Sequence, residues 1–487
     1  MKSLFLSIAA QIEPHFGHLF SHQFASHSLR VLLLILSRQL AHSLQPASSS
    51  SGKKSTLRKL STNDPKFAAF ESQVMDVIAE FTSAMNRLMA SGLRALDTDN
   101  IRHLATEAHA NPVLQILLSL EFQQAREHST SLTCSYFAKL FPDDPLTEGS
   151  ESGAFLQNLL FDTTGSHLLE VIISQAPEKV FKQIYNVFFR HHLGRSSRNE
   201  VAVFVVVRVL QRLSRHDLEG AVVELIPHFN DLFQKSRHVV VKTLIEQSRL
   251  RGLDVAMVAD ALRHFASKDE SITLLKILGL ETTPQSGLPA PSQEPVRQKD
   301  IDKGKIHNSL LAQTLLAEPD AARDVVNNAL LALDSFQLIL NSKSMTSSRI
   351  IQTALTCNDQ TATFKRPFTQ KFLGSICELA VDPVASHVVD ALWQGTSSLK
   401  FVREQVAQEL LAKENLLHQS VPGRAVWRNW KMDTFKRRRG EWLHETSSTP
   451  GAKASIDLAR ERHLRFLKGN KRTHRASLSS VQKTVTG

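Results

Sequence analysis

Apolar residues recur along most of this chain at the spacing of an α-helix, and several apolar runs open with a small residue followed by polar ones. The stretch TGSHLLEVII, residues 164–173, carries Ser166, His167 and Glu170 in such a run. The first and third are four positions apart and the second and third are three apart, so all three project from one face of a helix. The apolar residues cover the opposite face, which predicts an amphipathic helix with one polar corner.

The same polar corner returns elsewhere in the chain with different chemistry. We name its three positions slot one, slot two and slot five, after their order along the helix. The copies hold Ser26, His27 and Arg30; Asn111, Pro112 and Gln115; Ser166, His167 and Glu170; Ser348, Arg349 and Gln352; and Ser386, His387 and Asp390. A further copy at the end of the series places Arg424 and Arg428 in slots one and five.

Slot one recurs with a regular period. The anchors run Ser166, Val203, His238, Ile272, Ser309, Ser348, Ser386 and Arg424, at intervals of 34 to 39 residues. The copies at Val203, His238 and Ile272 are placed by apolar runs alone, so their register is fixed only to within one residue. Asn111 and Ser26 anchor two more copies upstream. This period predicts an all-α fold, an α-solenoid superhelix of about ten helical repeats whose slots line one concave surface.

Three segments that are poor in apolar residues and rich in turn formers interrupt the array. We expect them to be disordered loops or linkers. They lie at 43–66, 143–153 and 281–305. The predicted organisation is therefore a first repeat at 1–42, further repeats at 67–142, 154–280 and 306–433, and a tail at 434–487. The tail segments KRRRGEW and KGNKRTHR have no apolar period, so we expect no contribution to a core.

Composition supports a helical protein outside the membrane. Tyrosine occurs twice, glycine and proline are sparse, and 42% of the residues are apolar. The cysteines Cys134, Cys357 and Cys377 show neither a metal-site spacing nor a disulfide framework, which favours a reducing compartment. The apolar run in MKSLFLSIAAQ is short for a signal peptide, and the longest run, 31–36, is too short to span a bilayer. We expect a soluble intracellular protein.

The positive charge is concentrated at the end of the chain. The net charge is +11, and from Arg424 onward there are 16 Lys/Arg against 5 Asp/Glu, a difference of +11. The preceding residues hold 42 of each sign and balance to zero. A basic segment of this kind favours a polyanionic partner, although nuclear targeting or solubility would also account for it.

The slot chemistry suits the edges and faces of RNA bases. The carboxylate of Glu170 can accept two adjacent N–H groups, as a guanine edge presents them, and the amides of Gln115 and Gln352 match uracil or adenine. Arg30 supplies donors for cytosine. The flat side chains in slot two can stack on bases, an interaction worth about 1–3 kcal/mol per base. A single Ser-His start is also typical of a helix N-cap, but five corners in one register favour binding.

The repeats resemble those of Pumilio proteins, in which slots one and five contact a base edge and slot two stacks. The segment GRAVWRNWKMDTFKRRRGEW, residues 423–442, and the runs GSHLLEVII, SLLAQTLL and ASHVVDALW are similar to repeats of the nucleolar protein nine family. That resemblance implies a nuclear, nucleolar RNA-binding protein that holds small-subunit pre-ribosomal RNA, supports 18S rRNA maturation and meets proteins of the pre-ribosomal particle. The first copy of the polar corner begins at Ser26, closer to the start of the chain than is usual in that family, so we expect the array to be truncated.

The predicted RNA-binding residues follow from the slots. They are Ser26, His27, Arg30, Asn111, Gln115, Ser166, His167, Glu170, Ser348, Arg349, Gln352, Ser386, His387, Asp390, Arg424 and Arg428. The copies Val203, Phe204, Val207 and Ile272, Thr273, Lys276 have lost the base-reading chemistry, so we expect no uniform code of one base per repeat.

Two other classes of protein compete with RNA binding. An enzyme would need a catalytic constellation, and His15, His18 and His22 lack a carboxylate or cysteine that would complete a metal site. Phosphate-binding glycine loops and nucleophile elbows are also missing from the sequence. We therefore expect no enzymatic activity, no cofactor and no metal, in a protein that acts as a monomer. The stronger alternative is a HEAT/armadillo-type protein-binding scaffold or transport receptor, which would share the period without needing the polar corners.

Overall fold

All regular secondary structure in the part of the chain that the structure describes is helical. The computed structural model describes residues 2–37, 65–128, 132, 134–143, 146–268, 274–280, 298–318, 321–357 and 360–445. No strand occurs among these residues, and none of their helices is long and apolar enough to cross a membrane. The chain divides into two compact units, Met1–Asp254 and Val255–Gly487. The fold is therefore the predicted all-α solenoid, built as two successive units.

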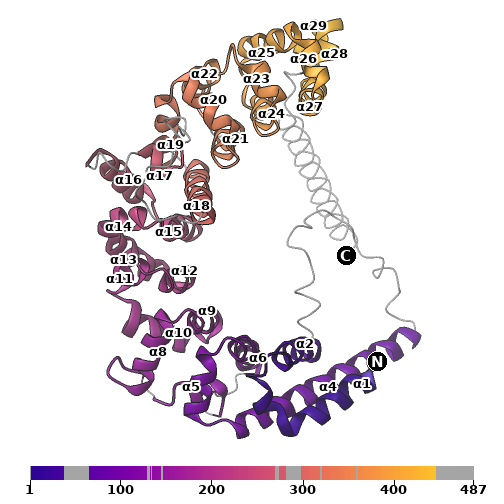
Figure 1. Ribbon diagram of the computed structural model, residues 1–487, viewed down its shortest axis with the longest axis vertical. Helices are drawn as coiled ribbons and strands as arrows, with labels where there is room; N and C mark the ends of the chain where they lie inside the picture. Colours follow the sequence, from indigo (N-terminus) through magenta and orange to yellow (C-terminus); the bar gives the residue numbers. More distant parts are fainter. Residues whose placement is uncertain are drawn as a thin grey trace, which may run out of the picture. The chain divides into compact units, whose positions relative to one another are not determined.

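The first unit consists of helices in two rows. Its elements are α1 (Lys2–Ile12), η1 (Glu13–Leu19), α2 (Ala25–Leu36), α4 (Pro65–Ala95), α5 (Thr98–Thr106), α6 (Asn111–His128), α7 (Tyr136–Leu140), α8 (Glu151–Phe161), α9 (Gly165–Gln175), α10 (Glu178–Ile184), η3 (Tyr185–Phe189), α11 (Leu193–Ser197), α12 (Ala202–Arg212), α13 (Arg215–Leu225), η4 (Ile226–His228), α14 (Phe229–Gln234) and α15 (His238–Leu250). Helices α2, α6, α9, α12 and α15 pack each against the next in one row (Figure 1). These are the helices that carry the slots.

The second unit repeats the arrangement. Its elements are α16 (Ala256–Lys268), α17 (Leu274–Ile277), α18 (Gln298–Ala317), α19 (Ala321–Ala332), α20 (Ser335–Lys343), α21 (Ser347–Thr356), α22 (Ala362–Gln370), α23 (Ile376–Val381), α24 (Ser386–Gly395), α25 (Lys400–Ala412), α26 (Glu414–Gln419), α27 (Val421–Asn429), α28 (Met432–Arg437) and α29 (Arg439–Glu445). Here α18, α21, α24 and α27 form the slot-bearing row, again each packed against the next. The described residues thus contain nine slot-bearing helices.

Apolar burial holds each slot-bearing helix between its neighbours. In α9 the side chains of Leu168, Leu169, Ile172 and Ile173 are fully buried. Burying one such side chain stabilises the fold by about 1.5–3 kcal/mol. Because the same pattern recurs in each helix of the row, stability is a sum of interfaces between adjacent repeats.

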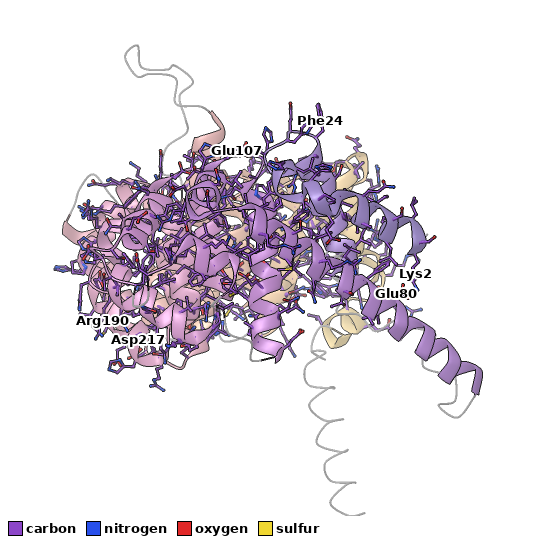
Figure 2. All side chains as sticks on the ribbon, turned by 90° about the horizontal axis from the view of Figure 1, so that it is seen from below. Lys2, Phe24, Glu80, Glu107, Arg190 and Asp217 are labelled. Atoms are coloured by element: carbon purple, nitrogen blue, oxygen red, sulfur yellow. The ribbon has the colours of Figure 1, made fainter. Side chains whose placement is uncertain are left out.

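The N-terminal repeat is completed by the long helix α4. This helix packs against α1 and η1, and the Lys2 Nζ lies 2.8 Å from the Glu80 carboxylate across the α1–α4 contact (Figure 2). Both side chains are well exposed, so this ion pair adds little stability. The main contribution comes from buried side chains such as Phe16, Leu88 and Leu33.

The expected loops are shorter than the sequence indicated. Helix α4 begins at Pro65, α8 at Glu151 and α18 at Gln298, each inside a segment that was expected to lack regular structure. In α8 the Ser150 hydroxyl accepts the N–H of Gly153 at 3.0 Å and so fixes the helix start. Residues 43–64 and 281–297 of the expected loops lie outside the described residues.

The copy expected at Ile272 differs from the others. Among the described residues 274–280, the structure forms the one-turn helix α17, and the next slot-bearing helix is α18. Ile272 and Thr273 lie outside the described residues, while the Lys276 carbonyl accepts a hydrogen bond from the side chain of Asn308 in the middle of α18. The apolar run TLLKIL therefore belongs to the approach to α18. The expected copy at Ile272 lies in part outside the described residues, and an apolar run alone does not distinguish a slot-bearing helix from a packed connector.

The last repeat extends further than predicted. Helices α28 and α29 pack onto α25 and α27, and Phe435 and Trp442 are buried with exposures of 5% and 0%. The Trp442 indole N–H donates to the Trp430 carbonyl at 2.9 Å. The segment KRRRGEW therefore does contribute to the core, contrary to the expectation for a tail that begins at 434. Residues 446–487 lie outside the described residues.

The buried carboxyl group of Glu121 should make the stability of the fold depend on pH. Its carboxylate accepts the N–H groups of Tyr136 (2.7 Å) and Phe137 (3.1 Å) at the start of α7. Burial nevertheless raises the pKa of Glu121 from 4.5 to about 7. The folded protein therefore binds this proton more tightly than the unfolded chain does. The stabilisation that the protonated carboxyl gives to the fold is complete below pH 4.5 and is lost as the pH rises through about 7.

The unfolding free energy should therefore fall by about 1.4 kcal/mol per pH unit in that window. Glu121→Gln should remove this slope, which circular dichroism melts between about pH 4 and pH 8 would measure. The exposed Glu127 of the same helix provides the control, because Glu127→Gln should leave the slope in place. A slope that survives Glu121→Gln would contradict the assignment.

Candidate nucleic-acid interface

The three slots differ in exposure. Slot one is buried in the polar corners: Ser166, Ser348 and Ser386 are exposed by only 4%, 1% and 5%. Slot two is exposed and slot five is half-buried in the same helices. The exposed set comprises His27, His167, Arg349 and His387, and the half-buried set comprises Arg30, Gln115, Glu170, Gln352 and Asp390. Of the three slots that were expected to line one surface, only slots two and five are therefore accessible, and slot one is buried.

The slot-one residues support packing between repeats. The Ser309 hydroxyl donates to the Thr346 carbonyl of the following repeat at 2.8 Å. Ser26 and Ser386 donate to carbonyls three residues earlier, at 3.4 and 3.3 Å. None of these three bonds is an N-cap, in which the hydroxyl would accept a backbone N–H. A small residue at slot one lets neighbouring helices approach closely.

A side chain four residues before slot one caps the turn that leads into the slot-bearing helix. The Asp162 carboxylate accepts the N–H groups of Thr164 (3.0 Å) and Gly165 (2.5 Å). The same contact to two successive N–H groups is made by His22, Glu107, Asn199 and Asp382. These residues fix the start of each helix and hence the direction of slot two. They were missed in the sequence, although their constant spacing from slot one was a usable signal.

The middle copies share the register of the polar corners. In α12, Val203 is buried, Phe204 is 51% exposed and Val207 is half-buried, as in slots one, two and five elsewhere. In α18, Gln313 occupies slot five and donates to the Ser309 hydroxyl at 3.1 Å. Gln313 was also missed, although SLLAQTLL shows the same spacing as the other polar corners.

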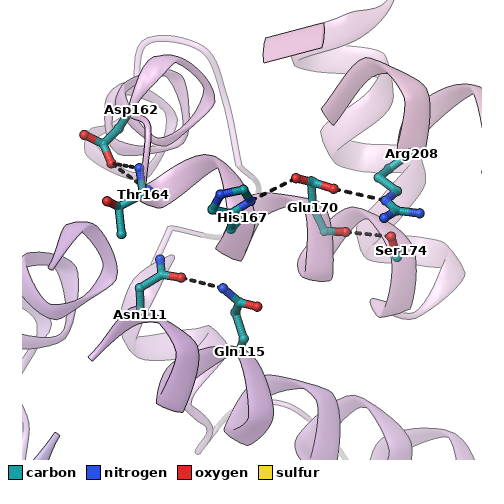
Figure 3. A network of polar contacts seen from close by, with 9 residues as sticks. Asn111, Gln115, Asp162, Thr164, His167, Glu170, Ser174 and Arg208 are labelled. Atoms are coloured by element: carbon teal, nitrogen blue, oxygen red, sulfur yellow. Dashed lines mark hydrogen bonds and ion pairs between the residues drawn. The ribbon is translucent and has the colours of Figure 1, made fainter. Parts of the chain in front are cut away.

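Polar contacts hold the slot-five side chains in place (Figure 3). The Glu170 carboxylate lies 3.2 Å from Nδ1 of His167 and 3.1 Å from Nε of Arg208, which belongs to α12. The Gln115 amide donates to the Asn111 side chain at 2.6 Å. These contacts restrict the rotamers of the groups that would face a ligand, which lowers the entropy cost of binding.

Adjacent corners enclose a shared pocket in the first unit. It has a volume of about 360 Å³ and is lined by slots two and five of both α2 and α6, together with Val171 of α9. The slot residues concerned are His27, Arg30, Pro112 and Gln115. A pocket between two successive corners suits a flat polar group whose edge contacts slot five while its face lies against slot two.

The corners of α24 and α27 meet in the second unit. The Asp390 carboxylate accepts a hydrogen bond from Asn429 at 3.0 Å. Burial raises the pKa of Asp390, and the bond from Asn429 opposes that rise. Arg424 and Arg428 are both exposed on α27, so slot one of this last copy is open where the others are covered. Arg424 donates to the His418 carbonyl at 3.0 Å.

Other candidate sites do not assemble. His22 is engaged in capping, and no group of histidine, cysteine or acidic side chains among the described residues is placed to hold a metal. A second pocket of about 460 Å³ lies on the outer row between η3 and α13 and includes Arg190 and Asp217 (Figure 2). It contains none of the slots, so it is separate from the candidate interface.

Comparison with known proteins agrees with the repeat architecture. A family model described as a NOP9-like PUF repeat domain matches residues 1–425. The protein named nucleolar protein 9 from Aspergillus clavatus is 38% identical over 476 residues, which cover 94% of this chain and 68% of that protein. The protein of the same name from Ajellomyces dermatitidis is 37% identical over 477 residues, covering 95% of this chain and 69% of that protein.

Solved structures support the fold. The structure of APUM23 with GGAGUUGACGG has a TM-score of 0.69 at 19% identity and covers 92% of this chain and 80% of that chain. The structure of APUM23 with GGAUUUGACGG has a TM-score of 0.67 at 18% identity, covering 91% of this chain and 79% of that chain. At this level of identity the likeness shows a shared helical-repeat fold.

Proposed function

Since this chain belongs to the family of NOP9-like PUF repeat proteins, we propose that its slot-bearing helices bind small-subunit pre-ribosomal RNA and support 18S rRNA maturation and small ribosomal subunit biogenesis. It is a nucleolar RNA-binding protein and not an enzyme, in keeping with its relatives named nucleolar protein 9. The protein would act by holding RNA, and in this way it could shield a processing site from nuclease. The family is a PUF one, which argues against a HEAT/armadillo-type scaffold or transport receptor.

One observation carries the proposal: slots two and five stay accessible in the same register along consecutive helices. His167 and Glu170 on α9 illustrate the pair, with side-chain exposures of 62% and 17%. The exposed imidazole can stack on a base while the carboxylate accepts hydrogen bonds from its edge. APUM23, which shares the fold, has been solved with an RNA oligonucleotide, and this supports RNA as the class of ligand.

Glu170→Ala and His167→Ala should each weaken RNA binding by about 1–3 kcal/mol. Both side chains reach solvent, so folding stability should change little. Fluorescence anisotropy with fragments of the small-subunit precursor RNA would measure the affinity, and thermal melts would measure the stability. Ser174→Ala, one turn further along α9, is the matched control because this side chain is exposed and outside the slots. An unchanged affinity combined with a large drop in melting temperature would show that the two residues are structural.

The cellular part of the proposal needs its own test. Depletion of the protein should leave small-subunit RNA precursors unprocessed, and crosslinking with sequencing of the bound RNA should identify the segment it holds. Intact processing after depletion would contradict the assignment. We also propose that the protein binds as a monomer and meets proteins of the pre-ribosomal particle, which light scattering and affinity purification would examine.

A further inference from the structure

The residue that directly follows slot five, which we name position six, contacts the preceding repeat at two places. Arg208 is position six of α12, and its Nε lies 3.1 Å from the carboxylate of Glu170 in slot five of α9. Asn429 is position six of α27, and its amide donates to Asp390 in slot five of α24 at 3.0 Å. The two contacts lie in different units and join equivalent positions. In both, a hydrogen-bond donor on the following helix meets a carboxylate.

Slot-five groups of other chemistry are held differently. The amide of Gln115 is bound to Asn111, that of Gln352 to Arg349, and Arg30 to His27, in each case within the same helix. For Gln115 and Gln352, position six of the following helix is Val171 and Ala391, whose side chains have no donor. For Gln313, position six of the following helix is Thr353, whose hydroxyl donates to the Arg349 carbonyl of its own helix at 2.8 Å. A donor that reaches slot five of the preceding helix thus accompanies Glu170 and Asp390, whereas the amides are anchored within their own helices.

We propose that position six of the following repeat is a further determinant of base recognition, with Arg208 and Asn429 as positioning residues for the acceptors Glu170 and Asp390. This inference rests on the proposed RNA-binding function and deepens it. Each acidic slot-five side chain would then bind a base edge that presents N–H donors, in an orientation set by position six of the following repeat.

The remaining acceptor capacity supports this role. A carboxylate has about four lone-pair positions. Glu170 uses one toward His167 and one toward Arg208, which leaves positions on both oxygens for two adjacent N–H groups. In Asp390 the oxygen that accepts from Asn429 keeps one further lone-pair position, while the other oxygen is buried and has no hydrogen-bond partner among the described residues. Each acid is therefore oriented by a neighbour without being saturated.

The positive charge of Arg208, in position six of α12, has a second effect on Glu170 of α9. A carboxylate next to an RNA strand is repelled by the phosphates, which disfavours its use as a base reader. The guanidinium of Arg208, 45% exposed, lies beside Glu170 and offsets that negative charge. Asn429 is neutral and provides orientation alone, so the two sites should differ in their response to salt.

The test compares base preference among variants of the full chain. Arg208→Met keeps the length of the side chain and removes the donor and the charge. We expect its discrimination at one nucleotide position of a random RNA pool to fall about tenfold, with preferences at other positions unchanged. Arg208→Lys should restore most of the discrimination. Arg215→Met on α13 likewise removes an exposed positive charge, but away from the slots, and should leave the preference intact.

A double-mutant cycle separates positioning from general charge. In a Glu170→Gln background, Arg208→Met should have little further effect on base preference, because its target is already changed. Wild-type protein that selects no RNA from the pool would overturn the proposed function itself. Selection by the wild type, with the same base preference in Arg208→Met and Arg215→Met, would overturn only the role of position six. Thermal melts of each variant would exclude misfolding as the cause.

Discussion

Trp430→Ala is expected to lower the free energy of unfolding of the last repeats by about 3–5 kcal/mol. The Trp430 side chain is fully buried between α24 and the final helices, and its indole N–H donates to the Val389 carbonyl at 3.1 Å. Its ring centroid lies 5.2 Å from that of Trp393 in an edge-to-face arrangement. Removal of this side chain leaves a large cavity, disrupts the aromatic contact with Trp393 and leaves the Val389 carbonyl without its indole donor.

The chain provides a convenient probe for this experiment. Its 4 tryptophans lie at positions 393, 427, 430 and 442, so intrinsic fluorescence reports only on the end of the array. Urea titrations followed by fluorescence should show an early transition in Trp430→Ala, while circular dichroism should show the remaining helices unfolding later. Trp430→Phe is the control, since it keeps most of the buried volume and loses only the hydrogen bond. A coincident loss of all helices would contradict the view that adjacent repeats stabilise each other locally.

The solenoid could be predicted because its cause is local. The spacing of apolar residues in GSHLLEVII and AVFVVVRVL gives one buried face per helix, and α9 and α12 bury these residues. The period of slot one then follows from the need to bury that face against the next repeat. Lys276 shows the limit of this reasoning, because the described part of TLLKIL forms only the one-turn helix α17.

The polar corners could be predicted in part. Slots two and five were placed correctly on the accessible side, as His167 and Glu170 show. The burial of slot one, as at Ser166, was not predicted, since burial depends on tertiary packing that the apolar pattern of one helix does not show. Position six was missed for the same reason: the contact of Arg208 with Glu170 joins residues 38 positions apart. Trp442 was assigned to a tail because a single apolar residue has no period, and only packing against Trp393 and Phe435 reveals its role.

The burial of Trp442 changes the design of a tail experiment. A deletion from residue 434 would remove Phe435 and Trp442 from the core, so it would confound loss of charge with unfolding. Residues 446–487 contain 9 Lys/Arg and 2 Asp/Glu, a net charge of +7, and follow the last described helix. A deletion of 446–487 therefore removes cations and leaves the described repeats complete.

Deletion of 446–487 should weaken binding to all RNAs alike, by roughly a hundredfold at low salt, and should flatten the dependence of affinity on salt. Each cation that neutralises a phosphate on a single strand contributes about 0.7 to the slope of log affinity against log salt concentration. The preference between good and poor RNA sequences should persist, because phosphate contacts carry no sequence information. Anisotropy titrations at several salt concentrations would measure both quantities.

A tail without cations separates the effect of positive charge from that of chain length. With the 9 Lys/Arg of 446–487 replaced by glutamine, the chain keeps its length and should reproduce the flattened slope of the deletion. Glu170→Gln should show the opposite behaviour, with a changed base preference and an almost unchanged salt slope, since it alters a contact to a base edge. If the tail deletion instead abolished discrimination and kept the salt slope, base recognition would involve the tail. The division of roles between the repeat corners and the basic segment would then be wrong.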